Sequence, residues 1–114
     1  MDDGWDAVLD AIAGDRDAAL ARLREFLAIP SVSTDPAYAG EVERAARWVS
    51  DRLEALGLAV SVIPTAGHPV VLGRSRAEEE LRPEAPGVLF YGHYDVQPAD
   101  PREGWTTPAF EPVV

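Results

Sequence analysis

A histidine and an aspartate stand two positions apart, at His93 and Asp95, and their types and spacing suit them to chemistry. A neutral imidazole is the commonest metal-ligating side chain in proteins. A histidine that binds a metal usually donates its other ring N–H to a carboxylate or a carbonyl group, which fixes its tautomer. Alternate residues of an extended segment point to the same side. His93 and Asp95 can therefore share one site, with the aspartate as an orienting or proton-handling neighbour of the ligand.

The same pair has a second interpretation, which is a structural histidine held by a hydrogen bond. The other histidine, His68, lies in a turn between two expected strands, and we expect it to be solvated rather than a ligand. The chain contains no cysteine, so it has neither a disulfide framework nor a thiolate site. Any metal would have to be held by nitrogen and oxygen ligands.

A run of four apolar residues, 88–91, must position the pair. A short unbroken apolar run that follows a Pro-Gly turn signal predicts a strand buried on both faces. Pro98 closes the segment, because proline cannot continue a central ladder. The strand would deliver the histidine and the aspartate at its carboxyl end, where open α/β sheets usually bind their ligands.

A longer motif surrounds this pair. Residues 91–98, which read Tyr-Gly-His-Tyr-Asp-Val-Gln-Pro, are followed by Gly104-Trp105 and by Pro-Ala-Phe-Glu-Pro at 108–112. Together they resemble the first metal motif of the M20 metallopeptidases, and most of all the dipeptidase branch, which is similar to carnosine dipeptidases and glutamate carboxypeptidases. The resemblance extends back through Ile-Pro-Ser-Val-Ser at 29–33 and covers essentially the whole chain in order.

The resemblance implies a co-catalytic two-zinc hydrolase that cleaves the amide bond of dipeptides or short acyl-amino acids. By it, His93 matches a zinc ligand and Asp95 matches the active-site aspartate beside that ligand. Manganese or cobalt could replace zinc, since nitrogen and oxygen ligands admit all three metals. The other ligands and the general-base glutamate of the family lie further along the chain. Residues 1–114 are therefore expected to be the amino-terminal portion of an M20-like catalytic domain, truncated before the remaining ligands.

The expected fold is α/β: the incomplete amino-terminal part of a zinc-peptidase-like domain, with two helices followed by strands of a central mixed sheet. Apolar periodicity predicts one helix over residues 5–28, with a kink or break at Gly14-Asp15, and another from residue 36 or 40 to residue 56. Strands are predicted over residues 58–63, 70–72 and 88–91, with a solvated loop over 74–86. The resemblance implies another strand at about residues 111–114.

Individual residues should fix the ends and the packing of these helices. Asp35 is suited to cap the start of the second helix and Gly57 to end it. Trp5 is expected to anchor the edge of the core, and Trp48 is expected to pack beside the apolar stripe of the second helix. Leu56 is predicted to close the buried face of that helix.

The charge of the chain limits its partners. With 10 basic and 20 acidic residues, its formal charge is −10, which repels nucleic acids and anionic membrane surfaces. No apolar stretch approaches the ~20 residues of a membrane span. The acidic amino terminus lacks the features of a signal peptide, so a cytoplasmic protein is expected. The partner implied by the resemblance is a small peptide or acyl-amino acid, with a homodimer only in a full-length form.

One convincing ligand does not make a catalytic metal site, which normally has three protein ligands and a water. We therefore expect the family activity in a full-length form and an inactive, marginally stable chain on its own. An alternative is a non-catalytic binding module, or a fragment that associates with a partner through an open sheet edge. A complete small protein with a structural histidine is a third interpretation.

Overall fold

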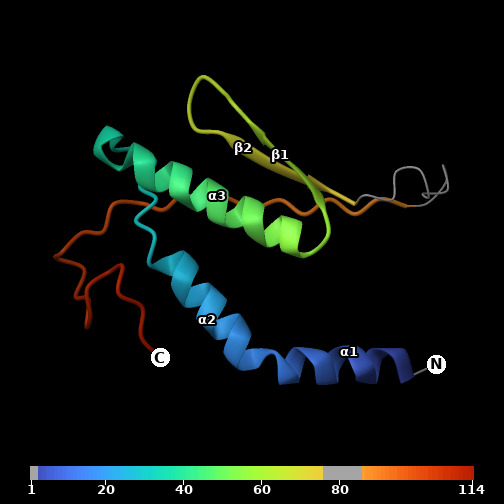
Figure 1. Cartoon of the computed structure of the whole chain (residues 1–114). Coiled ribbons are helices and arrows are strands. Elements are labelled where there is room, and N and C mark those ends of the chain that lie inside the picture. The colour runs from blue at the N-terminus through green and yellow to red at the C-terminus, as the bar shows by residue number, and fades with distance from the viewer. Residues whose placement is uncertain (1–2, 76–85) are drawn as a thin grey trace.

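Three α-helices, one β-hairpin and a long irregular tail make up the computed structural model (Figure 1), which describes residues 3–75 and 86–114. Within these ranges no helix is both long enough and apolar enough to cross a membrane. The predicted combination of helices with strands is confirmed at this level. The elements in chain order are α1 (Asp3–Gly14), α2 (Arg16–Leu27), the short 3-10 helix η1 (Pro36–Tyr38), α3 (Ala39–Ala55), β1 (Ala59–Ile63) and β2 (Val70–Arg74).

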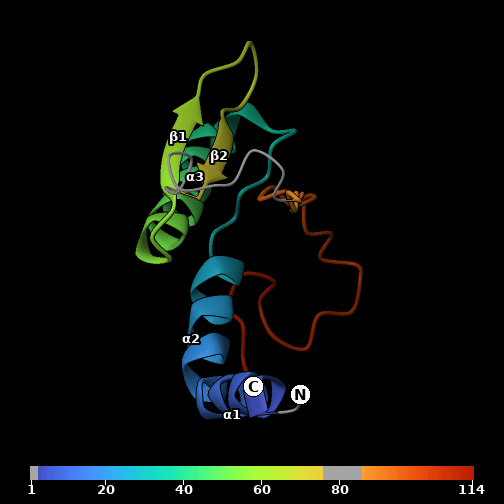
Figure 2. The same cartoon turned by 90° about the vertical axis from the view of Figure 1, so that its right-hand side faces the viewer.

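The break expected in the first helical region is present. α1 ends at Gly14 and α2 begins at Arg16, with Asp15 between them in a non-helical conformation. Glycine is among the weakest helix formers, which favours the break at this point. The carboxylate of Asp15 pairs with Arg22 of α2. Figures 1 and 2 show that the two helices run in clearly different directions.

Both predicted caps of the second helical region are confirmed. The Asp35 side chain accepts a hydrogen bond from the backbone N–H of Ala37, at 2.9 Å, and so starts η1, which leads directly into α3. Gly57 has a φ of 87° just after the end of α3. This is the left-handed conformation that glycine adopts without a Cβ penalty.

The conformation of Gly57 leads to a stability prediction. Gly57→Ala is expected to lower the free energy of unfolding by about 1 kcal/mol, because alanine is strained at this φ. Gly40→Ala is the matched control, since Gly40 lies inside α3 with open space around the added methyl group. It is expected to be neutral or mildly stabilising. Urea unfolding of both variants tests this, and equal losses would contradict the capping role of Gly57.

The hairpin packs on α3 and forms the compact part of the molecule. β1 pairs antiparallel with β2, from Ala59 opposite Arg74 to Ile63 opposite Val70, which confirms both predicted strands. A Cβ at Gly73 would lie 3.2 Å from the Cδ1 atoms of Leu53 and Leu58, so the glycine lets β2 approach α3 closely. In the described part of the chain few apolar residues are buried, namely Ile29, Val32, Val42, Ala45 and Ala46.

Aromatic stacking joins α2 to α3. The rings of Phe26 and Trp48 lie 4.8 Å apart between centroids and are nearly parallel, and Arg52 lies over Trp48. The packing role predicted for Trp48 is confirmed. The anchoring role predicted for Trp5 is wrong, because its side chain is 72% exposed, and Leu56 at the end of α3 is also exposed. The main helix or strand that α1 contacts among the described elements is α2, and the apolar side chains of Val8, Leu9 and Ile12 in α1 are exposed.

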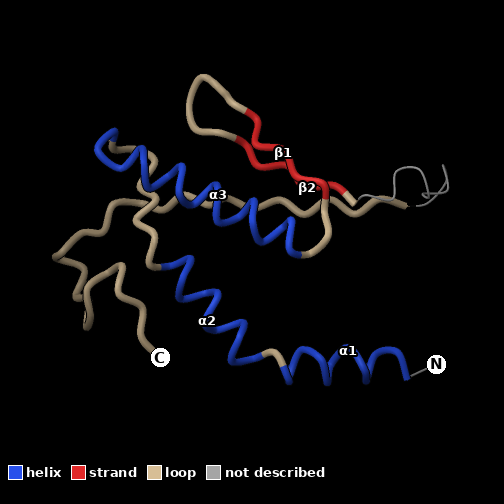
Figure 3. The backbone as a smooth tube through the Cα atoms, viewed as in Figure 1, coloured by secondary structure: helices blue, strands red, loops and turns tan. Residues whose placement is uncertain are grey.

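The largest correction concerns residues 88–91, which are not a buried strand. Their side chains are between 77% and 92% exposed, and no described strand pairs with them. A strand needs neighbours for its backbone groups and cover for its faces, and the described residues provide neither. Residues 111–114 are also not a strand (Figure 3). The sheet of the described residues therefore contains only the two antiparallel strands β1 and β2, and the expected central mixed sheet is not formed. The expected loop at 74–86 lies mostly outside the described residues.

Candidate metal-binding site

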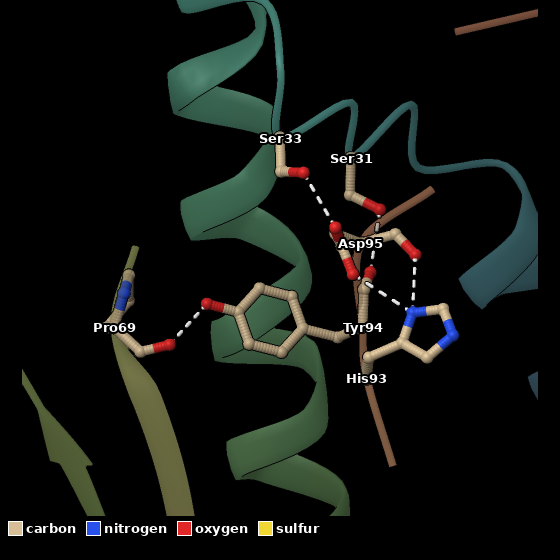
Figure 4. A network of polar contacts seen from close by, with 6 residues as sticks. All are labelled: Ser31, Ser33, Pro69, His93, Tyr94 and Asp95. Carbon is tan, nitrogen blue, oxygen red and sulfur yellow. Dashed lines mark hydrogen bonds and ion pairs between the residues drawn. The ribbon is translucent and has the colours of Figure 1, made fainter. Parts of the chain in front are cut away.

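Two segments that are far apart in the sequence lie side by side at the candidate site (Figure 4). Val32 and Val96 form a parallel β-bridge, and the N–H of Val96 donates to the carbonyl of Ser31 at 3.0 Å. The hydroxyl of Ser31, which is buried, donates to the carbonyl of Tyr94 at 2.7 Å. The backbone on both sides of Asp95 is therefore held by one short segment, residues 31–33.

The structure brings His93 and Asp95 into direct contact, as their spacing predicts. Nδ1 of His93 lies 2.9 Å from Oδ1 of Asp95 and 3.0 Å from the Asp95 backbone carbonyl. Both partners are acceptors, so Nδ1 must carry the proton. In a neutral ring this leaves the lone pair on Nε2. The side chain of His93 is 75% exposed, so this nitrogen is accessible, and the pair fits the arrangement of a ligating histidine and its orienting carboxylate.

A third side chain completes the arrangement. The hydroxyl of Ser33 donates to Oδ2 of Asp95 at 2.6 Å, so each carboxylate oxygen has its own donor. The Ser33 hydroxyl holds the pKa of Asp95 below its usual value. Partial burial opposes this shift, while the hydrogen bond from His93 adds to it. Asp95 is therefore a stable anion at neutral pH, as an orienting carboxylate should be.

This shift predicts a measurable effect of Ser33→Ala. The pKa of Asp95 should rise towards the ordinary aspartate value, because the largest cause of its depression is removed. A depressed folded pKa contributes stability above the unfolded pKa of about 3.9 and loses it as the pH falls. The stability difference between the two proteins should therefore shrink under acid. A carbon-13 titration of the Asp95 carboxyl checks the shift, and an unchanged pKa would contradict it.

The turn between β1 and β2 supports the same site. Nε2 of His68 lies 2.9 Å from the carbonyl of Ser33, and the hydroxyl of Tyr94 donates to the carbonyl of Pro69. His68 is exposed, as expected of a solvated residue, but it also joins the turn to the serine segment. Partial burial raises the pKa of Tyr94, and the charge of Asp95 adds to the shift.

The sequence analysis missed the two serines and the tyrosine as parts of this site. One signal was available, because Ser31 and Ser33 alternate around an apolar residue, as the polar side of a short strand would. Among the described residues, no three His, Cys, Asp or Glu side chains gather into a group that could hold a metal ion. The site consists of one candidate ligand and its supports.

A groove of about 570 Å³ runs beside the site, between β2 and residues 89–95. Phe26, Val49 and Leu53 contribute to its lining from the helices. His93 and Asp95 are also among its lining residues, so the groove borders the candidate site.

Comparisons with known proteins give relatives of this chain in sequence and in structure. No model of a known protein family matches the chain. It is 36% identical over 104 residues to the Cys-Gly metallodipeptidase DUG1 of Candida albicans, covering 80% of this chain and 21% of the relative. It is 34% identical over 101 residues to the Beta-Ala-His dipeptidase of Rattus norvegicus, covering 81% and 20%. The solved structure of the di-peptidase Dug1p from Saccharomyces cerevisiae superposes with a TM-score of 0.82 and 29% identity, over 97% of this chain and 25% of that chain.

The chain is therefore a homologue of dipeptidases. Its relatives include Cys-Gly metallodipeptidases and Beta-Ala-His dipeptidases, which confirms the resemblance to the dipeptidase branch noted in the sequence. The chain spans about one fifth of the length of the curated relatives it matches. The high TM-score means that its elements are arranged like the matching part of a much longer solved dipeptidase.

Proposed function

We propose that this chain contributes a metal ligand, His93, and an active-site carboxylate, Asp95, to a metal-dependent hydrolase of the M20 type. The observation that carries the proposal is the use of Nδ1 of His93 by two acceptors, which leaves Nε2 free and exposed. Zinc fits a neutral imidazole nitrogen, and manganese and cobalt accept the same donor.

The roles of the two residues follow from their contacts. His93 would hold the cation through Nε2, while Asp95 fixes the ring orientation and strengthens the ring as a donor. A divalent cation bound there would polarise the scissile carbonyl and lower the pKa of a bound water. The Ser33 hydroxyl donates to Oδ2 and lowers the pKa of the Asp95 carboxyl, while Oδ1 accepts from the ring.

The substrate is proposed at the level of a class. The relatives are named for the hydrolysis of Cys-Gly and of Beta-Ala-His, which are different dipeptides. We therefore propose hydrolysis of the amide bond of a dipeptide or a short acyl-amino acid. We also propose that residues 1–114 act as the amino-terminal portion of a catalytic domain and do not catalyse alone. A catalytic zinc site normally needs three protein ligands, and this pair supplies one ligand and its support.

A chimera tests the proposal. The chain would replace the matching segment of the Candida albicans Cys-Gly metallodipeptidase, to which it is 36% identical. The folded, zinc-loaded chimera is expected to hydrolyse Cys-Gly, while the 114-residue chain alone is not. A chimera that shows the cooperative unfolding of the parent enzyme and binds zinc, but has no hydrolytic activity, would overturn the proposal. Activity of the isolated chain would overturn its dependence on a larger protein.

The exposed segment at residues 88–91 favours a second candidate, a non-catalytic module that binds a partner strand. The segment is extended and apolar, pairs with no described strand, and borders the groove beside β2. Extended peptides commonly add to such open sheet edges. Sedimentation of the chain mixed with the Candida albicans enzyme lacking its matching segment separates the two candidates. A complex that regains Cys-Gly hydrolysis favours the hydrolase, whereas a complex without metal binding or hydrolysis favours the module.

A further inference from the structure

We propose that Ser33 is a positioning residue for His93: acting through Asp95, its hydroxyl sets the orientation and the tautomer of the imidazole. The inference rests on the proposed function, because the consequence of that orientation is the affinity of His93 for a metal. Figure 4 shows the three side chains in a row, with the serine hydroxyl, the carboxylate and the ring in sequence.

Hydrogen bonds, rather than packing, must hold the ring in place. The side chain of His93 is 75% exposed and that of Asp95 is 42% exposed. Side chains with so much exposure retain rotational freedom unless specific bonds remove it. The ring is held by Oδ1 of Asp95, at 2.9 Å, and by the Asp95 backbone carbonyl, at 3.0 Å. The carboxylate is in turn held through Oδ2 by the Ser33 hydroxyl, at 2.6 Å.

Ser33 is itself firmly placed. The residue before it, Val32, is buried and pairs with Val96 in the parallel bridge. The carbonyl of Ser33 accepts a hydrogen bond from His68, whose Nε2 must carry a proton because a carbonyl can only accept. The backbone that carries the Ser33 hydroxyl is therefore fixed by the β-bridge at Val32 and by the hydrogen bond from His68 in the hairpin turn.

Ser31 and Ser33 donate to different kinds of acceptor. Ser31 is buried and its hydroxyl donates to the main-chain carbonyl of Tyr94. That bond holds the two segments together and would be kept whatever side chain stood at position 95. Ser33 instead donates to the carboxylate itself, at a charge-assisted distance. Of the two serines, Ser33 is therefore the one whose hydroxyl contacts the carboxylate that orients the ring.

Loss of the Ser33 hydroxyl should release the carboxylate. Asp95 could then turn away from the ring, which leaves the Asp95 backbone carbonyl as the remaining acceptor for Nδ1. His93 would then carry its proton on Nε2 in part of the molecules, a form that cannot bind a metal through that nitrogen. Loss of a partner directly bonded to a ligand lowers metal affinity by roughly 10- to 100-fold. Because Ser33 acts one bond further away, we expect a loss near the lower end, about 10-fold.

The first test needs no metal. Long-range nitrogen-15 spectra of the 114-residue chain, at a pH of about 8 where an ordinary histidine is neutral, report the tautomer of His93. Wild-type chain and Ser33→Thr are expected to hold the proton on Nδ1, and Ser33→Ala is expected to show a mixture of tautomers. Thr34→Ala, a change at the exposed next residue, should resemble wild type. A fixed Nδ1–H form in Ser33→Ala, with an otherwise intact amide spectrum, would overturn the inference.

The second test measures zinc affinity in the chimera by competition with a chelator. Ser33→Ala is expected to bind zinc about 10-fold more weakly, while Ser33→Thr and Thr34→Ala stay close to the parent. Zinc binding that is lost in His93→Ala but unchanged in Ser33→Ala would overturn this inference alone. Zinc binding that survives His93→Ala would instead overturn the proposed function, while the tautomer measurement would still decide the role of Ser33.

Discussion

Replacement of His93 by alanine in the zinc-loaded chimera is expected to abolish dipeptide hydrolysis and to weaken zinc binding by more than about 100-fold. The loss should exceed the roughly 10- to 100-fold effect of an outer partner, because the ligand itself is removed. The proposal behind this expectation is that Nε2 binds the metal, since Nδ1 is used by Asp95. Chelator competition and initial rates of Cys-Gly hydrolysis measure the two losses.

The variant Asp95→Asn tests the role of the orienting carboxylate while the ligand His93 is kept. Asparagine keeps the size of the side chain and an acceptor oxygen for the ring, but it removes the negative charge. It is expected to weaken zinc binding by roughly 10- to 100-fold, which is less than the loss of the ligand. Asp100→Asn is the control, because Asp100 is a nearby carboxylate whose partner is Arg102 rather than a histidine. Equal effects of Asp95→Asn and Asp100→Asn would contradict a specific role for Asp95.

Replacement of Phe90 by lysine is expected to affect stability little in the isolated chain and strongly in the chimera. In the 114-residue chain the ring is 91% exposed, so the free energy of unfolding should change by less than about 0.5 kcal/mol. Self-association of the chain should decrease, because a long exposed apolar segment invites edge pairing and a lysine opposes it. In the chimera, where we expect the groove beside residues 88–91 to be filled, the same change should destabilise by more than about 3 kcal/mol.

Sedimentation and urea unfolding provide the readouts for both settings. Leu56→Lys is the matched control, since Leu56 is also an exposed apolar residue but lies at the end of α3, away from the groove. The Leu56→Lys change should leave the self-association of the 114-residue chain unchanged. A chimera that tolerates Phe90→Lys as well as the isolated chain does would show that the segment stays exposed in the larger protein.

Local sequence signals predicted the helices and the hairpin well. The Gly14-Asp15 break, the Asp35 cap, the Gly57 terminus and both strands of the hairpin are found in the structure. Each depends on residues that are neighbours in the chain, so a sequence pattern is sufficient to find them. The contact between His93 and Asp95 is of the same kind, because only one residue separates them.

Predictions that depended on distant partners failed. The apolar pattern at residues 88–91 correctly indicates an extended segment suited to burial, but burial depends on strands that the described residues do not supply. Trp5 fails for the same reason, since an apolar face is buried only where another element covers it. Ser33 was missed because its partner, Asp95, lies 62 positions away, beyond the range of any local pattern.

That separation has a consequence for the order of folding. Helices and hairpins form within microseconds, whereas pairing of residues 62 or 63 positions apart must wait for a long loop to close. During synthesis at about 5–20 residues per second, Asp95 is added roughly 3–12 s after Ser33. Through this interval the hydroxyls of Ser31 and Ser33 lack their partners at Tyr94 and Asp95, although α3 and the hairpin can form as they are synthesised. The hydrogen bond from Ser33 to Asp95 can therefore form only after α3 and the hairpin have been synthesised, so under our proposal His93 is oriented late in folding.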